Sequence, residues 1–138
     1  MRALKQIAPM QISAVWPRLR EGMAAIESPD GWIIEDVYCT LRQGGATLYL
    51  VVIDDEEVGF VVLRQINDFD GTRLHIWLLH ARSDVDVMAE FSDELDRIAR
   101  SINAATITFS TTRRGWSKTA PKYRFSVRET VYQRKLKP

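Results

Sequence analysis

Several residue types that mark particular classes of protein are scarce in this chain of 138 residues. Its single cysteine, Cys39, cannot form an internal disulfide, which excludes a disulfide-stapled secreted scaffold. With only two histidines beside that cysteine, no metal site is expected. No stretch approaches the roughly 20 apolar residues of a membrane helix, and residues 1–10 lack the apolar run of a signal peptide. These absences predict a soluble, cytoplasmic protein.

The composition that remains is typical of an ordinary globular protein. Hydrophobic residues make up 46% of the chain and charged residues 27%. A chain of this size buries enough apolar surface to fold without a metal or a disulfide. Because no repeat, low-complexity tract or flexible linker interrupts it, residues 1–138 are interpreted as one domain.

The net charge of +1 conceals a strong asymmetry along the chain. Residues 113–138 contain nine basic and one acidic residue, a net charge of +8, whereas residues 1–112 contain ten basic and seventeen acidic residues, a net charge of −7. Near-neutrality disfavours a uniformly basic nucleic-acid binder but allows a local anion site. The basic segment is interpreted either as such a site, or as a surface that balances the acidic helices.

Hydrophobic periodicity predicts a mixed α+β protein. The predicted strands cover residues 3–7, a hairpin over 47–66 that turns at 54–57, and residues 74–79, 105–110 and 126–136. The predicted helices begin at the caps Ser13, Ser28 (with Pro29 in the first position) and Ser83 or Asp84, and a short one covers 116–122.

The buried faces of these helices follow from spacings of three and four residues. The predicted stripes are Val15, Leu19, Met23 and Ile26, then Ile33, Val37 and Leu41, then Met88, Phe91, Leu95, Ile98 and Ile102. Pro17 is expected in the first turn of the first helix. The strand–helix–strand order over 74–110 requires two parallel strands. We therefore expect a mostly antiparallel sheet of about six to seven strands, flanked by three to four helices.

This order of segments resembles the GCN5-related N-acetyltransferase (GNAT) superfamily over almost the whole chain. The segments that carry the resemblance are TLYLVVIDDEEVGFVVLRQI, LHIWLL, the helix from Met88 to Ile102, TITFS and GWSKTAPKYRFSVRETVYQRKL. The Trp16-Pro17 start and the RRGW junction are also similar to GNAT-like proteins of short-tailed bacteriophages, which would place the chain in the host cytoplasm or the virion. The resemblance implies transfer of an acetyl group from acetyl-CoA to an amine.

The resemblance also implies a place for acetyl-CoA, between strands 74–79 and 105–110, with its diphosphate at the start of the following helix. The residues it assigns to the cofactor are Leu79, Ala81, Arg82, Ser83, Val87, Met88, Arg113, Arg114 and Lys118. The glycines of the family loop are absent from the segment HARSDVDVMA, in which Asp84 and Asp86 would repel phosphates. This loop is interpreted as a degenerate coenzyme A loop.

Two side chains are candidates for proton transfer. His80, at a strand end, is the candidate base that deprotonates the amine, or else an exposed loop histidine. His75 and His80 are predicted to point to opposite faces of a regular strand. The family often has, at the position of Ala120, a tyrosine that acts as general acid and protonates the departing thiolate. Tyr123 is therefore either a displaced general acid or a residue that packs on the sheet.

Two functions of different classes follow. One is an acyl-CoA-dependent N-acyltransferase acting on an amine that the sequence does not identify. The other is a non-catalytic, degenerate GNAT fold that binds an acidic protein surface through its basic carboxyl-terminal segment, for example as a virion-associated module.

Overall fold

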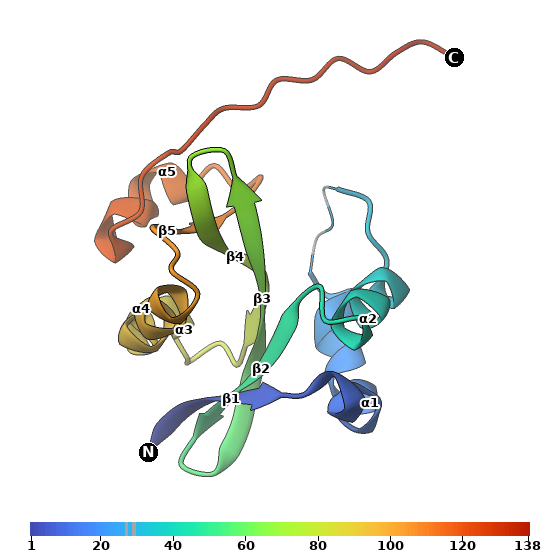
Figure 1. Ribbon diagram of the computed structural model, residues 1–138, viewed down its shortest axis with the longest axis vertical. Coiled ribbons are helices and arrows are strands. Elements are labelled where there is room, and N and C mark those ends of the chain that lie inside the picture. The colour runs from blue at the N-terminus through green and yellow to red at the C-terminus, as the bar shows by residue number, and fades with distance from the viewer. Residues whose placement is uncertain (27, 29) are drawn as a thin grey trace.

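Five strands form one mixed sheet in the computed structural model, which describes residues 1–26, 28 and 30–138 (Figure 1). They follow one another across the sheet in chain order: β1 (Arg2–Ile7), β2 (Thr47–Ile53), β3 (Glu56–Asp68), β4 (Gly71–Ala81) and β5 (Thr106–Phe109). Neighbouring strands are antiparallel, except that β4 and β5 are parallel. The predicted α+β class, hairpin and parallel crossover are therefore confirmed.

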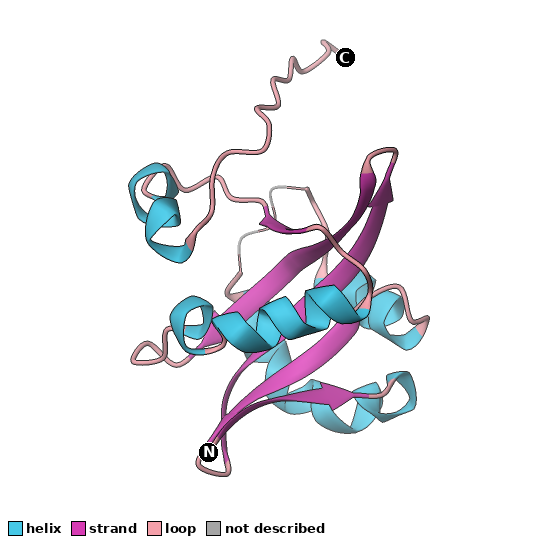
Figure 2. Ribbon diagram, turned by 60° about the vertical axis from the view of Figure 1, so that its left-hand side comes forward, coloured by secondary structure: helices cyan, strands magenta, loops and turns pink. Residues whose placement is uncertain are grey.

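The helices cover both faces of this sheet (Figure 2). They are α1 (Ile12–Ala24), α2 (Ile34–Arg42), α3 (Val87–Glu90), α4 (Ser92–Ser101) and α5 (Trp116–Thr119), with single 3-10 turns η1 (Pro9–Gln11) and η2 (Ala120–Tyr123). α1 and α2 pack on one face, and α3 and α4 on the other (Figure 1). In the described part of the chain, no helix is long and apolar enough to span a bilayer.

The core has two layers because side chains alternate across β3. Phe60 and Val62 lie in the layer under α1 and α2, whereas Val61 and Leu63 lie in the layer under α3 and α4. The stripe predicted for the first helix fills the former layer, where Met23 is fully buried. Burial of this kind contributes about 1.5–3 kcal/mol for each large apolar side chain.

The first two helices begin at other residues than predicted. α1 already starts at Ile12 because the η1 turn leads directly into it, so Ser13 is not its cap and Pro17 lies in its second turn. α2 begins after Ile33, whose N–H donates to the carboxylate of Asp36 at 2.9 Å. This bond caps the helix where Ser28 was expected to.

Two further details of the second helix differ from the prediction. The Ser28 hydroxyl donates instead to the Trp32 carbonyl at 2.8 Å, and Pro29 lies outside the described residues. Ile33 is 59% exposed because it precedes the helix, so only Val37 and Leu41 form the buried stripe.

The third predicted helix is divided at Phe91, whose φ and ψ of −115° and 18° are not helical. Backbone bonds continue through the division, from Phe91 N–H to Val87 O at 3.0 Å and from Leu95 N–H to Phe91 O at 2.9 Å. Met88, Phe91 and Leu95 are all buried, as their spacing predicts. The predicted helix over 116–122 is present as α5 and η2.

The strand predicted over residues 126–136 is absent, so the described residues contain five strands where six to seven were expected. Residues 124–138 are all described, and none of them pairs with β5. Phe125 packs on Phe109 with ring centroids 5.0 Å apart, and the C-terminal end of the chain projects from the body (Figures 1 and 2). Residues of high β propensity form a strand only when they pair with a neighbouring strand, and residues 126–136 have no such partner.

Candidate functional site

The candidate site is the cleft that opens where β4 and β5 separate. The two strands pair only from Arg73 to Ile76 on β4 and from Thr106 to Phe109 on β5. β4 then continues to Ala81, whereas the chain after Phe109 turns away (Figure 2). A cleft of about 750 Å³ follows, lined by residues 76–88, residues 109–113, the two residues after α1, and Trp116, Thr119 and Tyr123.

A β-bulge at Trp77 shapes the floor of this cleft. Leu63 pairs with Ile76 and Val62 pairs with Leu78, so Trp77 is the extra residue in β4. A bulge bends its strand and increases the local twist. The bulge falls directly after Ile76, the last residue of β4 that pairs with β5.

The bulge corrects the predicted placement of the histidines. Because Trp77 interrupts the alternation of side chains, His75 and His80 point to the same face, the one that α1 and α2 cover. His75 is held by Thr108, with its Nδ1 at 2.8 Å from the hydroxyl oxygen. Burial, and then the charge of Arg73, lower the pKa of His75.

His80 lies in the cleft at the end of β4. Its ring stacks on Phe60 with centroids 5.7 Å apart and is exposed on its other side. Gly22 in α1 makes room for it, since a Cβ on Gly22 would lie 2.8 Å from His80 Cδ2. The sequence contains no local sign of this contact between α1 and β4.

Arg82 and Asp84 form an exposed ion pair at the start of the loop after β4. Arg82 donates from Nε to Asp84 at 2.6 Å and from a terminal nitrogen at 3.2 Å, and it also reaches Glu56 at 3.1 Å. The hydrogen bonds from Arg82 lower the pKa of Asp84, and those same bonds raise the pKa of Arg82. The guanidinium is therefore already engaged by two carboxylates.

Asp86 caps α3, and not Ser83 or Asp84 as predicted. Residues 82–85 form a turn closed by Val85 N–H and the Arg82 carbonyl at 2.9 Å, so the helix begins only after Asp86. The Asp86 carboxylate accepts from Ala89 N–H at 3.2 Å. A carboxylate thus occupies the first turn of α3.

Tyr123 contacts the same carboxylate from the opposite wall of the cleft. Its hydroxyl donates to Asp86 at 2.6 Å, and this hydrogen bond raises the pKa of Tyr123. Its ring lies 6.1 Å from that of Trp116. The sequence spacing of 37 residues does not reveal this bond.

The other residues proposed for the cofactor divide into two groups. Leu79 and Ala81 pack toward α3 and α4, and Val87 and Met88 are 4% and 8% exposed, so these four residues can offer a ligand mainly their backbone. Ser83, exposed, lines the cleft.

The three basic residues after β5 are exposed, but they are not placed alike. Arg113 lines the cleft, whereas Arg114 and Lys118 lie outside its lining. Among the described residues, no group of three or more His, Cys, Asp or Glu side chains could hold a metal ion.

Several solved structures that resemble this chain are acetyltransferases. A ribosomal-protein-alanine N-acetyltransferase from Brucella melitensis biovar Abortus 2308 has a TM-score of 0.70 at 14% identity, with 99% of this chain and 100% of that chain covered. An aminoglycoside N-acetyltransferase, AAC(6')-Iy in complex with CoA, has a TM-score of 0.69 at 13% identity, covering 98% and 95%. A probable acetyltransferase has a TM-score of 0.65 at 15% identity, covering 99% and 97%.

These likenesses establish a GNAT-like fold, as the sequence predicts, at identities that define the fold alone. No protein-family model matches the sequence, and no curated protein matches it.

Proposed function

We propose that this chain is an N-acyltransferase that binds an acyl-CoA thioester, with acetyl-CoA as the simplest donor, and transfers its acyl group to an amine. The observation that carries this proposal is the separation of β4 and β5 at the Trp77 bulge, which opens the cleft. The similarity to an aminoglycoside acetyltransferase in complex with CoA, over 98% of this chain, supports a ligand of this class. In this proposal residues 1–138 act as one domain.

The acyl end of the cleft fits such a ligand. Beyond Ile76, the edge of β4 that faces β5 has no partner strand among the described residues, so its backbone groups can bind an extended thioester arm as a strand would. The residues of this edge are Trp77, Leu78, Leu79, His80 and Ala81.

The end of the cleft that would hold the diphosphate has little net positive charge to attract it. Arg82 neutralises Asp84, and Arg113 adds a further cation to the lining. The Asp86 carboxylate opposes a phosphate in the first turn of α3. We therefore expect binding weaker than a glycine-rich loop would give, with Arg114 and Lys118 contributing from outside the lining.

Bound CoA thioester supplies an activated carbonyl carbon for attack by the amine. His80, exposed in the cleft, is placed to accept the proton that the amine loses. Tyr123 can donate a proton to a leaving thiolate only after its hydroxyl turns away from Asp86, so this bond fixes the tyrosine at rest.

Calorimetric titration with acetyl-CoA tests the proposal. Binding at 100 times the dissociation constant raises the free energy of unfolding by about 2.7 kcal/mol, which a thermal shift detects. Asp84→Asn should tighten binding because it frees Arg82 from its ion pair, and Asp86→Asn should do so because asparagine still caps α3 without the negative charge. Asp93→Asn, the same charge change outside the cleft lining, is the control. Absence of binding at millimolar acetyl-CoA would refute the proposal that this chain is an N-acyltransferase.

A second candidate function is a non-catalytic binding module, including one associated with a phage virion. The hydrogen bond between Tyr123 and Asp86 favours this function. It engages the hydroxyl of the candidate general acid and holds it at the start of α3, where the diphosphate would bind. In that case the basic carboxyl-terminal residues bind an acidic protein surface. Reversal of Arg113, Arg114 and Lys118 to Glu should abolish capture of such a partner, and unchanged capture would count against this surface.

A further inference from the structure

The guanidinium of Arg64 lies over the ring of Trp77, the residue that forms the bulge in β4. Its central carbon is 4.9 Å from the centroid of that ring. Trp32 meets Trp77 edge to face, with ring centroids 6.3 Å apart. All three side chains are half-buried. An arginine that stacks on an aromatic ring keeps the edge of its guanidinium, with its N–H donors, available to a ligand.

Arg64 has no counter-charge in the part of the chain that the structure describes. Among residues 1–26, 28 and 30–138, no carboxylate forms an ion pair with its guanidinium. Its neighbour Arg73, by contrast, donates to Asp68 at 2.8 Å and to the Thr108 hydroxyl at 2.9 Å. A half-buried cation gains from a partner that restores the hydrogen bonds it has lost to water. Arg64 is therefore a candidate ligand contact.

The charges around Arg64 favour an anion with a single negative charge. His75 lies opposite Arg64 on the adjacent strand. Burial, and then the charges of Arg73 and Arg64, lower the pKa of His75, so this ring is neutral near pH 7. The opposing charge of Asp30 is the weakest of these influences. One unpaired cation balances a carboxylate, which a guanidinium binds through two parallel hydrogen bonds, whereas a phosphate group carries nearly two charges.

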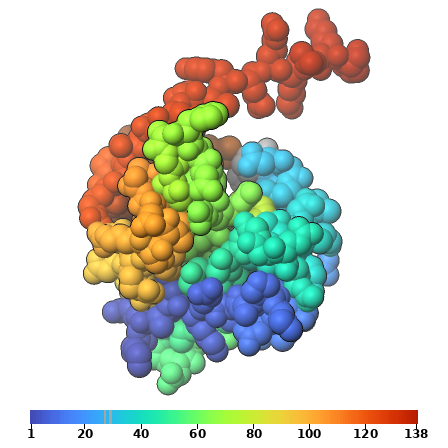
Figure 3. Space-filling view, in the orientation of Figure 1, coloured from blue at the N-terminus to red at the C-terminus, as the bar shows by residue number. Residues whose placement is uncertain are grey.

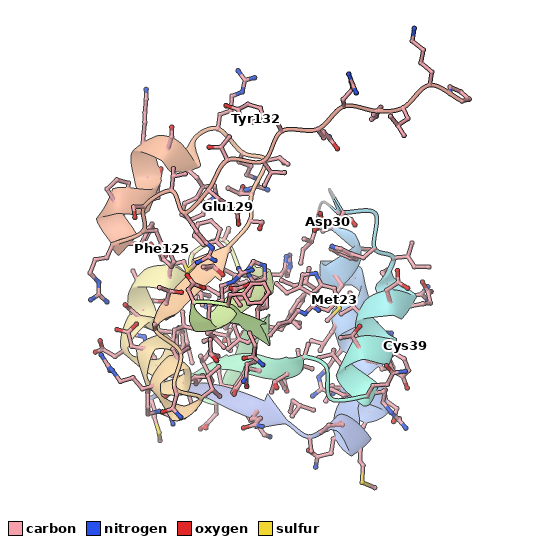
Figure 4. The ribbon with its side chains drawn as sticks, turned by 45° about the horizontal axis from the view of Figure 1, so that its top comes forward. Met23, Asp30, Cys39, Phe125, Glu129 and Tyr132 are labelled. Carbon is pink, nitrogen blue, oxygen red and sulfur yellow. The ribbon has the colours of Figure 1, made fainter. Side chains whose placement is uncertain are left out.

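The stacked pair lies beside the proposed reaction centre. Trp77 and His80 both line the cleft, as does Ile26 after α1. The surface is hollowed between the green hairpin of β3 and β4 and the blue to cyan segment that joins α1 to α2 (Figure 3). Asp30 lies on that segment (Figure 4). Trp77 and His80 are separated by about 10 Å along the strand, so a ligand that reaches both must be several bonds long.

We propose that the acyl acceptor is an amine that also carries a carboxylate several bonds away, and that Arg64 binds this carboxylate beside Trp77. The amine end lies at His80, which takes up the proton that the nitrogen loses. The nitrogen forms an amide bond with the acyl carbon, and the carbon–sulfur bond breaks with its electron pair left on sulfur. This inference rests on the proposed acyltransferase function and names the class of its substrate.

Two acceptors of equal length test this class. With acetyl-CoA as donor, release of the free thiol is measured with 6-aminohexanoate and with 6-aminohexan-1-ol, which has the same chain and a neutral end. Because hydrogen bonds to charged groups are the stronger ones, we expect kcat/KM to be at least about tenfold higher for 6-aminohexanoate. Equal values for the two acceptors would overturn the acceptor class and leave the acyltransferase proposal intact.

A pair of variants tests the assignment to Arg64. Arg64→Gln should lower kcat/KM for 6-aminohexanoate to about the value for 6-aminohexan-1-ol. Arg100→Gln is the matched control, because it removes an exposed cation from α4, on the other face of the sheet, and should keep the full preference. A preference that persists in Arg64→Gln, or that both variants lose equally, contradicts the assignment.

Equilibrium binding distinguishes failure of this site from failure of the proposed function. Calorimetric titration with 6-aminohexanoate, with and without CoA, should show binding that Arg64→Gln weakens at least about tenfold and that Arg100→Gln leaves unchanged. If this result is obtained while acetyl-CoA does not bind, the carboxylate site stands and the acyltransferase proposal fails. If 6-aminohexanoate binds in neither condition, the acceptor class is wrong, whether or not acetyl-CoA binds.

Discussion

At the scale of single residues, close backbone approach beside the cleft depends on Gly59. A Cβ at this position would lie 2.7 Å from Ala81 Cα and would also meet the His80 carbonyl oxygen, both of them backbone atoms of the neighbouring strand. Backbone cannot move aside as a side chain end can. The end of β4, with His80 and the cleft it lines, is therefore positioned by the absence of a side chain on β3.

Gly59→Ala should consequently lower the free energy of unfolding by about 1–3 kcal/mol, measured by urea denaturation. Gly115→Ala is the matched control, because nothing lies within 4 Å of its Cβ position and its backbone is helical. That control should change stability by less than about 0.5 kcal/mol. Equal effects of the two substitutions would contradict the packing argument.

His75 should make stability depend on pH. Burial, and then the charges of Arg73 and Arg64, lower its pKa against the opposing charge of Asp30. Below about pH 6.5 the unfolded chain binds a proton that folded His75 does not, so the free energy of unfolding falls as the pH drops from about 7 to 5. This contribution is fully present above that range.

Urea titrations across that range can isolate the contribution of His75. His75→Gln keeps a polar partner for Thr108 without the titrating ring, and it should flatten the dependence on pH. His80→Gln removes an exposed histidine and serves as control. If the wild-type chain and His75→Gln have the same slope, the pKa of His75 does not differ between the folded and unfolded states.

At the scale of elements, the hairpin of β2 and β3 turns through two residues with positive φ, Asp54 at 49° and Asp55 at 66°. Such a turn matches the twist of the strands, and glycine suits its second position best. Asp55→Gly should raise the free energy of unfolding by about 0.5 kcal/mol, and Asp55→Ala should lower it by about 1 kcal/mol. Thermal denaturation ranks the three chains, and alanine above glycine would contradict the turn assignment.

The elements that could be predicted from the sequence are those that local periodicity determines. The stripe of α1 and the alternation within the hairpin both repeat within a few residues, so the sequence alone reveals them. The bulge at Trp77 and the break at Phe91 lie inside uniformly apolar patterns, which carry no sign of either. Segment 126–136 has a strand pattern, but a strand also requires a partner edge.

For the candidate site, the location could be predicted from the sequence, but the bonds within it could not. The resemblance indicates the ends of β4 and β5 as its location, and the structure places a cleft there. The bonds that occupy it join distant residues, Arg82 with Glu56 and Asp86 with Tyr123, and no spacing rule relates them. The residue that caps a helix depends on where the preceding turn ends. Here a turn over residues 82–85 delays the start of α3, so Asp86 is the cap and not Ser83 or Asp84.

At the scale of the whole molecule, the separation of charge is the property that a ligand senses first. The segment of net charge +8 begins beside the cleft at Arg113, while the acidic remainder includes α3 and α4. A field of this kind attracts a phosphate-bearing ligand toward one side of the cleft, and salt screens it. The acyl arm of the same ligand carries no charge and does not sense the field.

Acetyl-CoA and acetyl-pantetheine therefore separate the two ends of the proposed site. Raising the salt concentration from about 0.05 M to 0.5 M should weaken acetyl-CoA binding several-fold and leave acetyl-pantetheine binding unchanged, as followed by calorimetry. Replacement of Arg113, Arg114 and Lys118 by Gln, which removes their charge without introducing the opposite one, should remove the difference between the ligands. An equal response of both ligands to salt would mean that the basic segment does not recognise the phosphates, because only acetyl-CoA carries phosphate charges that salt can screen.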